Sequence, residues 1–167
     1  MDTWACTREA VNWLNLSTLA GLGLATVSRC RMVRGHRGIL LARNYPLPWP
    51  KAGAFTVGNV VFLRARLSGP DSPAGLLAHE ETHATQYALF LGLPFLPLYL
   101  VAAGYSWLRT SDSASMNPFE RAAGLQTGGY CEFPSRPLMP VLLAGSRRVL
   151  GRIPRRSSPP PFAGGTA

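Results

Sequence analysis

The most informative part of this chain is the sequence His79-Glu80-Glu81-Thr82-His83, which directly follows the apolar residues 75–78. Side chains four residues apart share one face of a helix, so His79 and His83 can direct their imidazole nitrogens at one metal ion. Glu80 then projects beside the coordination position that stays open. The stretch therefore predicts a helix that carries two ligands and the acid–base residue of a hydrolytic metal centre.

Signals on both sides set the limits of this motif helix. Pro73 suits its first turn, Asp71 or Ser72 can cap it, and Gly92 stops it. The motif helix is accordingly predicted from residue 73 to residue 90.

Short strands are predicted before the motif helix. Residues 54–63 are rich in β-branched and aromatic side chains, and Gly58-Asn59 marks a bulge or a tight turn, so the segment is one bent strand or a hairpin. Residues 38–42 suit another short strand, residues 9–28 suit one helix, and a further apolar helix is predicted over 97–108. The fold class is α+β: a mostly helical single domain with a small antiparallel β-sheet packed beside the motif helix.

Glu120 is predicted as the third metal ligand. A zinc site that keeps one position open needs about three protein ligands. Most of the eight acidic residues lie in the motif, near the N-terminus or in loops, which leaves Glu120 and Glu132. Glu120 follows an apolar excursion long enough to return the chain to the motif helix. Asn117 and Pro118 open a helix there, and a Glu three residues after an Asn cap also fits a capping box, so both roles stay open and are not exclusive.

The predicted chemistry is hydrolysis of a peptide bond. Zn²⁺ is the ion that suits this motif best, and it lowers the pKa of a bound water toward neutrality. Glu80 would take the proton as the water attacks a carbonyl and then pass it to the leaving amine. The oxyanion needs a further donor, for which Tyr99, Tyr105 and Arg121 all remain open.

A known pattern is visible in residues 75–87 around the motif, residues 117–123 downstream and residues 55–61 upstream. Together these segments resemble the small bacterial H-E-x-x-H proteins related to gluzincin-type zinc metallopeptidases. The resemblance covers about residues 54–125.

The resemblance implies a ligand set and a catalyst. It implies zinc held by His79, His83 and Glu120, with Glu80 as the catalytic residue. Many gluzincins also place an acidic residue four positions after the ligand glutamate to orient a histidine, and this chain has Gly124 there. The resemblance therefore supplies the ligands but no residue that would orient them.

Charge is concentrated toward the C-terminus. The chain has a net charge of +9, and six arginines fall within residues 136–156. A short basic amphipathic helix is predicted over 141–152, and residues 153–167 are predicted to be a disordered Pro/Ser/Gly tail, which leaves 1–152 as the folded domain. The positive field leaves open a weak contact with a membrane surface, while no base-reading motif points to nucleic acid.

The remaining features favour a cytoplasmic location, with peripheral membrane contact left open. Cys6, Cys30 and Cys131 are far apart and form no C-x-x-C pair, which favours reduced thiols. Asp2 and Glu9 stand where a signal peptide would be positive. The apolar residues from 87 to 108 are broken by Gly and Pro, which favours two short buried helices over a membrane span.

Three function hypotheses follow. The first is a zinc-dependent metallopeptidase-like protein whose partner is a peptide or protein substrate, paired along the strand near residues 56–63. The alternative keeps the metal without catalysis: a zinc-stabilised peptide-binding module, or a membrane-associated one. The third is a small membrane-associated protein whose apolar segment and basic C-terminal part carry the function and whose histidines are incidental.

Overall fold

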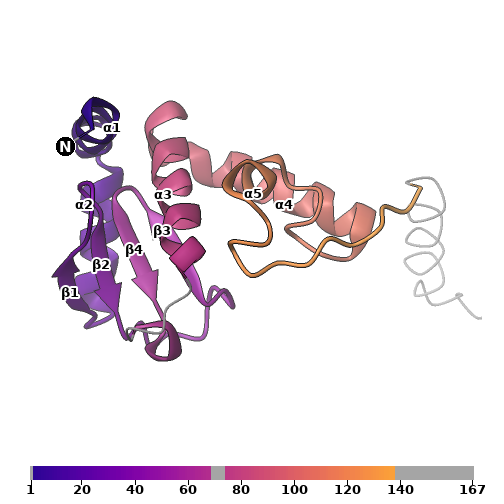
Figure 1. Ribbon diagram of the computed structural model, residues 1–167, viewed down its shortest axis with the longest axis horizontal. Helices are drawn as coiled ribbons and strands as arrows, with labels where there is room; N and C mark the ends of the chain where they lie inside the picture. The colour runs from indigo at the N-terminus through magenta and orange to yellow at the C-terminus, as the bar shows by residue number, and fades with distance from the viewer. Residues whose placement is uncertain (1, 69–73, 138–167) are drawn as a thin grey trace, which may run out of the picture. The chain divides into compact units, whose positions relative to one another are not determined.

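A computed structural model describes residues 2–68 and 74–137, and residues 1–135 form one compact unit. Its elements in chain order are α1 (Thr3–Leu14), α2 (Ser17–Val27), β1 (Arg31–Arg34), β2 (Leu40–Arg43), β3 (Ala54–Val57), β4 (Val60–Leu63), a short 3-10 turn (Ala65–Leu67), α3 (Ala74–Leu89), α4 (Phe95–Thr110) and α5 (Pro118–Ala123). The predicted α+β class, with a small sheet beside the motif helix, is confirmed (Figure 1).

The segment 54–63 is a hairpin. Strands β3 and β4 pair across Gly58-Asn59, with Val57 opposite Val60 at the turn. Gly58 has φ +62°, and a Cβ there would lie 2.4 Å from the backbone nitrogen of Thr18. Glycine is needed at this turn because the first residues of α2 pack directly against it.

The sheet is mixed, which differs from the purely antiparallel sheet predicted. Its order is β1-β2-β4-β3, and β2 runs parallel to β4, with Leu40 opposite Val60. The cause is the connection after β2, because residues 44–53 carry the chain past the position of β4 to the edge of the sheet. Strand β3 forms there and runs antiparallel to β2, and the hairpin then places β4 between them, parallel to β2. As a result β3 is an edge strand.

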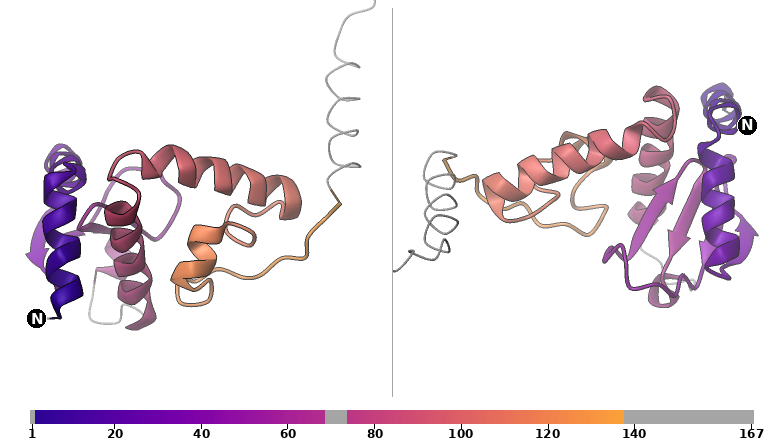
Figure 2. Two further views of the ribbon diagram at one scale, coloured as in Figure 1. Left: turned by 90° about the horizontal axis from the view of Figure 1, so that it is seen from above. Right: turned by 180° about the vertical axis from the view of Figure 1, so that it is seen from behind.

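Two helical layers cover the sheet, with α2 on one face and α3 on the other (Figure 2). Successive side chains of a strand point to opposite faces. In β4, Val60 and Phe62 therefore join the core on the α2 side, whereas Val61 and Leu63 join the core that includes Leu76 of α3. All four residues of β4 are buried, so the strand next to β3 is the most firmly packed part of the sheet.

The N-terminal helix predicted over residues 9–28 is two helices. Leu16 adopts a left-handed conformation with φ 66°, and the Asn15 side chain accepts hydrogen bonds from the Ser17 nitrogen (3.1 Å) and hydroxyl (2.7 Å). Asn side chains that satisfy the first free N–H groups start new helices. Asn15 therefore begins α2 where the apolar pattern alone suggested continuity.

The apolar segment from residue 87 to residue 108 is broken as predicted, but its second helix is not buried. Helix α3 ends at Leu89, and α4 leaves Leu100 59%, Val101 73% and Trp107 60% exposed. Apolar composition predicted burial here, while the helix contacts the rest of the fold through few residues, such as Phe95 and Ser106.

Within the described ranges, none of the helices taken singly has the length and apolar character needed to cross a membrane. One pair passes that test jointly, by length and composition: α1 and α2, which are bent by 73°. The predicted helix over 141–152 and the predicted tail over 153–167 lie outside the described residues, as do the proposed capping residues of α3.

Candidate metal centre

Helix α3 brings the two motif histidines together on its inner face. His79 and His83 are both buried, and their Nε2 atoms lie 3.0 Å apart. The opposite face of the motif carries Glu81, which forms ion pairs with Arg8 at 2.5 Å and with Arg37 at 2.7 Å. These ion pairs tie α3 to α1 and to the turn after β1, and they fix which face of the helix is turned inward.

Helix α5 supplies the third residue. Asn117 caps this helix by accepting a hydrogen bond from the Phe119 nitrogen at 3.0 Å. The Asn117 nitrogen itself donates to the Ala114 carbonyl, so Glu120 does not serve as a capping-box partner. Its Oε2 lies 3.2 Å from His79 Nε2, and its Oε1 lies 3.6 Å from His83 Nε2. The structure thus brings together the three side chains predicted as ligands.

Hydrogen bonds on the far side of each ring fix the histidine tautomers. His79 Nδ1 lies 2.9 Å from the Gly124 carbonyl oxygen, and His83 Nδ1 lies 2.8 Å from Gln86 Oε1. Both partners are acceptors, so each ring carries its hydrogen on Nδ1 and turns an Nε2 lone pair inward. The Gln86 amide nitrogen in turn donates to the Phe119 carbonyl at 2.9 Å, which links α3 to α5.

The donor set fits a divalent cation. Ligand atoms at about 2.0–2.1 Å from a tetrahedral zinc lie about 3.3 Å from one another. The two Nε2 atoms lie 3.0 Å apart, His79 Nε2 lies 3.2 Å from Glu120 Oε2, and His83 Nε2 lies 3.6 Å from the other carboxylate oxygen, Oε1, all close to that value. Glu120 Oε2 is buried, and it has no hydrogen-bond partner in the described part of the chain. Two facing lone pairs and an unpaired carboxylate oxygen form a group that could hold a metal ion.

The electrostatics of the cluster also favour a positive charge. Burial opposes a charged His83 ring, yet the adjacent Glu120 carboxylate outweighs it and raises the pKa of His83. Burial likewise opposes ionisation of Glu120, but the adjacent His79 and His83 rings outweigh it and lower the pKa of that carboxyl. A carboxylate held ionised in a buried site attracts a proton or a metal cation to the neighbouring nitrogens.

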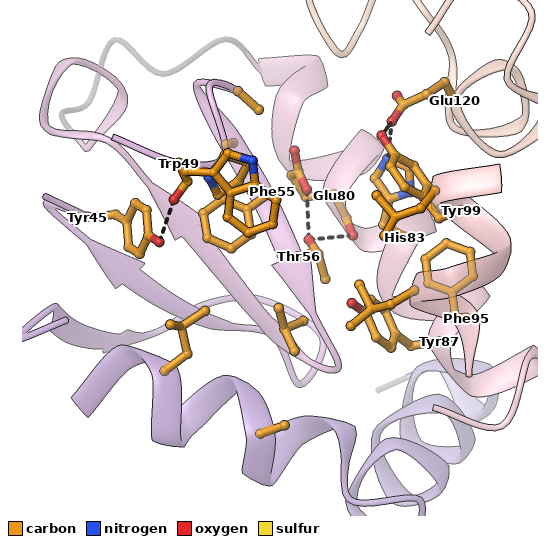
Figure 3. Close-up of a pocket in the computed structure, with 18 of the residues that line it drawn as sticks. Tyr45, Trp49, Phe55, Thr56, Glu80, His83, Tyr87, Phe95, Tyr99 and Glu120 are labelled. Carbon is orange, nitrogen blue, oxygen red and sulfur yellow. Dashed lines mark hydrogen bonds and ion pairs between the residues drawn. The ribbon is translucent and has the colours of Figure 1, made fainter. Parts of the chain in front are cut away.

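Glu80 lies beside this group with one carboxylate oxygen held by strand β3. Its Oε2 accepts a hydrogen bond from the Thr56 hydroxyl at 2.7 Å (Figure 3). Burial raises the pKa of the Glu80 carboxyl, although His83 and Thr56 counteract part of the effect. A carboxylate that is fixed and poorly solvated is suited to accept a proton from a nearby water.

A cleft of about 700 Å³ opens onto Glu80, both histidines and Glu120. Among the three residues considered as oxyanion donors, only Tyr99 lines it, and its hydroxyl donates to Glu120 Oε1. The Tyr105 hydroxyl accepts a hydrogen bond from Arg109, and the Arg121 guanidinium donates to the Ser115 carbonyl and to Glu132. Neither Tyr105 nor Arg121 lines the cleft.

Tyr130 is a site residue that the sequence did not reveal. Its ring lies 6.0 Å from the His79 ring and lines the cleft. Burial, together with the charges of Glu120 and Glu80, raises its pKa, so the hydroxyl keeps its proton and can donate. The loop that carries it is pressed onto the histidine: a Cβ at Gly128 would lie 2.4 Å from His79 Cε1.

The comparisons bear on the part of this site that α3 carries. A family model described as the eCIS core domain matches residues 24–89. That range includes the strands β1 to β4 and the whole of α3, and it ends before Glu120. Domains of that family are related to H-E-x-x-H metallopeptidase-like proteins, which agrees with the resemblance noted from the sequence. Searches of curated proteins and of solved structures gave no match.

The remaining site residues that were not predicted differ in how clearly the sequence indicates them. Gln86 lies three positions after His83, on the same side of a helix, and that spacing could have identified it. Thr56 could have been placed facing α3 by strand alternation. Tyr130 follows Gly128-Gly129 with no motif around it, and nothing in the sequence connects it to His79.

Proposed function

We propose that this protein is a zinc-dependent metallopeptidase-like enzyme that hydrolyses a peptide bond with Glu80 as general base. The observation that carries the proposal is the inward convergence of two Nε2 lone pairs and the Glu120 carboxylate within 3.0–3.6 Å of one another. His79, His83 and Glu120 would hold the ion. Zinc, when bound, supplies a Lewis acid for the substrate carbonyl and a water that ionises near neutral pH.

The chain's own residues supply the proton transfers and the positioning. Glu80 accepts a proton from the attacking water and delivers it to the leaving nitrogen, while Thr56 holds the carboxylate in place. Tyr99 is occupied by Glu120, so Tyr130, whose ring lies beside His79 on the cleft, is the hydroxyl that we assign as donor to the oxyanion. This assignment replaces Tyr105 and Arg121 among the donors considered.

The edge strand β3 offers a place for the substrate backbone. Gly53 and Arg64 form a hydrogen-bonded pair, and pairs of this kind recur at every second residue of an antiparallel ladder. The N–H and C=O groups of Ala54 and Thr56 therefore point away from β4. Both residues line the cleft, where an extended peptide can pair with them next to Glu80.

Metal analysis of purified full-length protein tests the proposal. Wild type should retain one zinc ion per chain, and His83→Ala should lose it, because two remaining ligands hold zinc weakly. Glu80→Gln should keep both the zinc and the fold, yet lose about 10²–10⁴-fold in the rate of peptide hydrolysis.

The same variants distinguish the enzyme from a non-catalytic zinc-binding module. A zinc-stabilised module without catalysis would bind the ion, unfold with chelator and behave identically with Glu80→Gln. Wild-type protein that purifies without metal and takes up none from added zinc would contradict both readings.

A further inference from the structure

Two apolar walls border the cleft on opposite sides of its polar centre. One wall is the segment 45–52 and the other is α4, and Figure 3 shows the Glu80 region between Trp49 and Phe55 on one side and Phe95 and Tyr99 on the other. The apolar side chains that line the cleft include Leu24, Leu47, Pro48, Trp49, Leu96 and Leu100. Among the described residues, neither wall contributes an Asp, Glu, Lys, Arg or His side chain to the lining.

The wall formed by residues 45–52 is held rigidly by Arg64. The guanidinium donates hydrogen bonds to the carbonyls of Ala52 (2.9 Å), Leu47 (2.9 Å) and Pro50. The Tyr45 hydroxyl adds a bond to the Trp49 carbonyl at 2.8 Å. A segment whose backbone is bonded at four carbonyls presents its side chains without first having to become ordered, which favours binding.

Trp49 is the side chain that this wall presents. It is 73% exposed although its own carbonyl is bonded, and Leu100 of α4 is similarly exposed at the cleft. Large aromatic side chains held on a rigid backbone and open to solvent are the residues that dominate binding interfaces. A group placed between Trp49 and α4 would remove apolar surface from water on both sides.

The backbone beside the wall determines what kind of molecule can occupy it. The β3–β4 register turns the N–H and C=O groups of Ala54 and Thr56 away from β4, and both residues line the same cleft. An extended peptide satisfies these groups and carries side chains in alternation, whereas an acyl chain leaves them without partners.

We infer that the cleft selects peptides with a bulky apolar side chain beside the cleaved bond, received between Trp49 and Leu100. This inference rests on the proposed function for the position of the cleaved bond. Its binding part is independent of catalysis, because the wall, α4 and the β3 edge lie outside the metal ligands.

Binding to full-length, zinc-loaded Glu80→Gln protein tests the inference without turnover. Two fluorescent peptides that are identical except for a central Phe or Ser are compared by anisotropy, together with a fluorescent fatty-acyl probe. The Phe peptide should bind about tenfold more tightly than the Ser peptide, a difference that one buried aromatic group can supply.

Paired variants locate the subsite. Trp49→Ala should reduce Phe-peptide affinity to that of the Ser peptide, whereas Trp107→Ala, an exposed Trp outside the cleft, should leave it unchanged. Leu100→Asp, on the α4 wall, should likewise reduce the affinity for the Phe peptide to that for the Ser peptide. The neighbouring Val101→Asp lies outside the cleft and should leave the affinity unchanged. Circular dichroism of each variant confirms that the fold is retained.

Equal affinity for the two peptides, or no binding of either, would overturn the inference. So would an acyl probe that binds as tightly as the Phe peptide and is lost in Trp49→Ala, because it would assign the wall to a lipid chain. Wild-type protein that binds the Phe peptide selectively but cleaves neither would uphold the subsite and contradict the peptidase. Wild-type protein that cleaves the Phe and Ser peptides equally well would uphold the peptidase and contradict the subsite.

Discussion

Strand β4 and helix α4 are both rich in apolar residues and opposite in burial. Every residue of β4 is buried between two helical layers, whereas α4 keeps several large apolar side chains in solvent. The metal site draws on both kinds of region: His79 and His83 belong to α3, packed on the sheet, and Glu120 belongs to the short α5 beside α4. A firmly packed half carries two ligands, and a loosely packed half carries the third.

The third ligand therefore comes from the part of the fold that leaves more apolar surface in solvent. Helix α5 has six residues, too few to be stable without contacts elsewhere. Its contacts with α3 include those of Glu120 and the hydrogen bond from Gln86 to the Phe119 carbonyl. A metal ion bound to all three ligands would therefore hold the two halves together.

The largest expected effect comes from breaking the packed half. Phe62→Ala should lower the free energy of unfolding by about 3–5 kcal/mol, because the ring is fully buried and stacks on Phe55 at 4.6 Å. Trp107→Ala on α4 should change it by about 0.5 kcal/mol or less, since that side chain is mostly exposed. Urea unfolding with chelator present measures both values. Similar losses in the two variants would erase the contrast between β4 and α4.

Metal removal should act on the other half. With chelator, amide hydrogen exchange in residues 118–123 should accelerate about 100-fold, because the buried Glu120 carboxylate loses its cation while α5 has little stability of its own. Exchange in residues 60–63 should stay unchanged. Mass spectrometry of peptides from the two segments measures the difference, and added zinc should restore protection. Equal acceleration in both would show that the metal stabilises the whole unit rather than the link to α5.

A smaller effect is expected at the bridge between the halves. Gln86→Met keeps a similar shape but removes the acceptor for His83 Nδ1 and the donor to the Phe119 carbonyl. Zinc affinity should fall about 10–100-fold, as it does when residues that orient metal-bound histidines are lost. Competition with a chromophoric chelator measures it. Gln126→Met, an exposed change in the loop after α5, is the matched control and should bind zinc as wild type does.

The metal ligands could be predicted from the sequence because helical periodicity alone determines which side chains share a face. The spacing of His79 and His83 places both on one helix face, and few acidic residues compete with Glu120. Features that depend on packing between distant segments could not be predicted in this way. The left-handed Leu16 divides a helix that looked continuous, β2 pairs in parallel because of the route taken by residues 44–53, and apolar composition alone cannot distinguish the buried β4 from the exposed α4.

The hydrogen-bond partner of His79 is a main-chain atom, the Gly124 carbonyl oxygen. Substituting residue 124 therefore changes the local conformation but cannot delete the oxygen itself. Alanine scanning would pass over this contact, and a search for a paired acidic side chain would wrongly report it missing. Amide-to-ester replacement of the following peptide unit, which weakens that oxygen as an acceptor, is the chemical route to measuring its contribution.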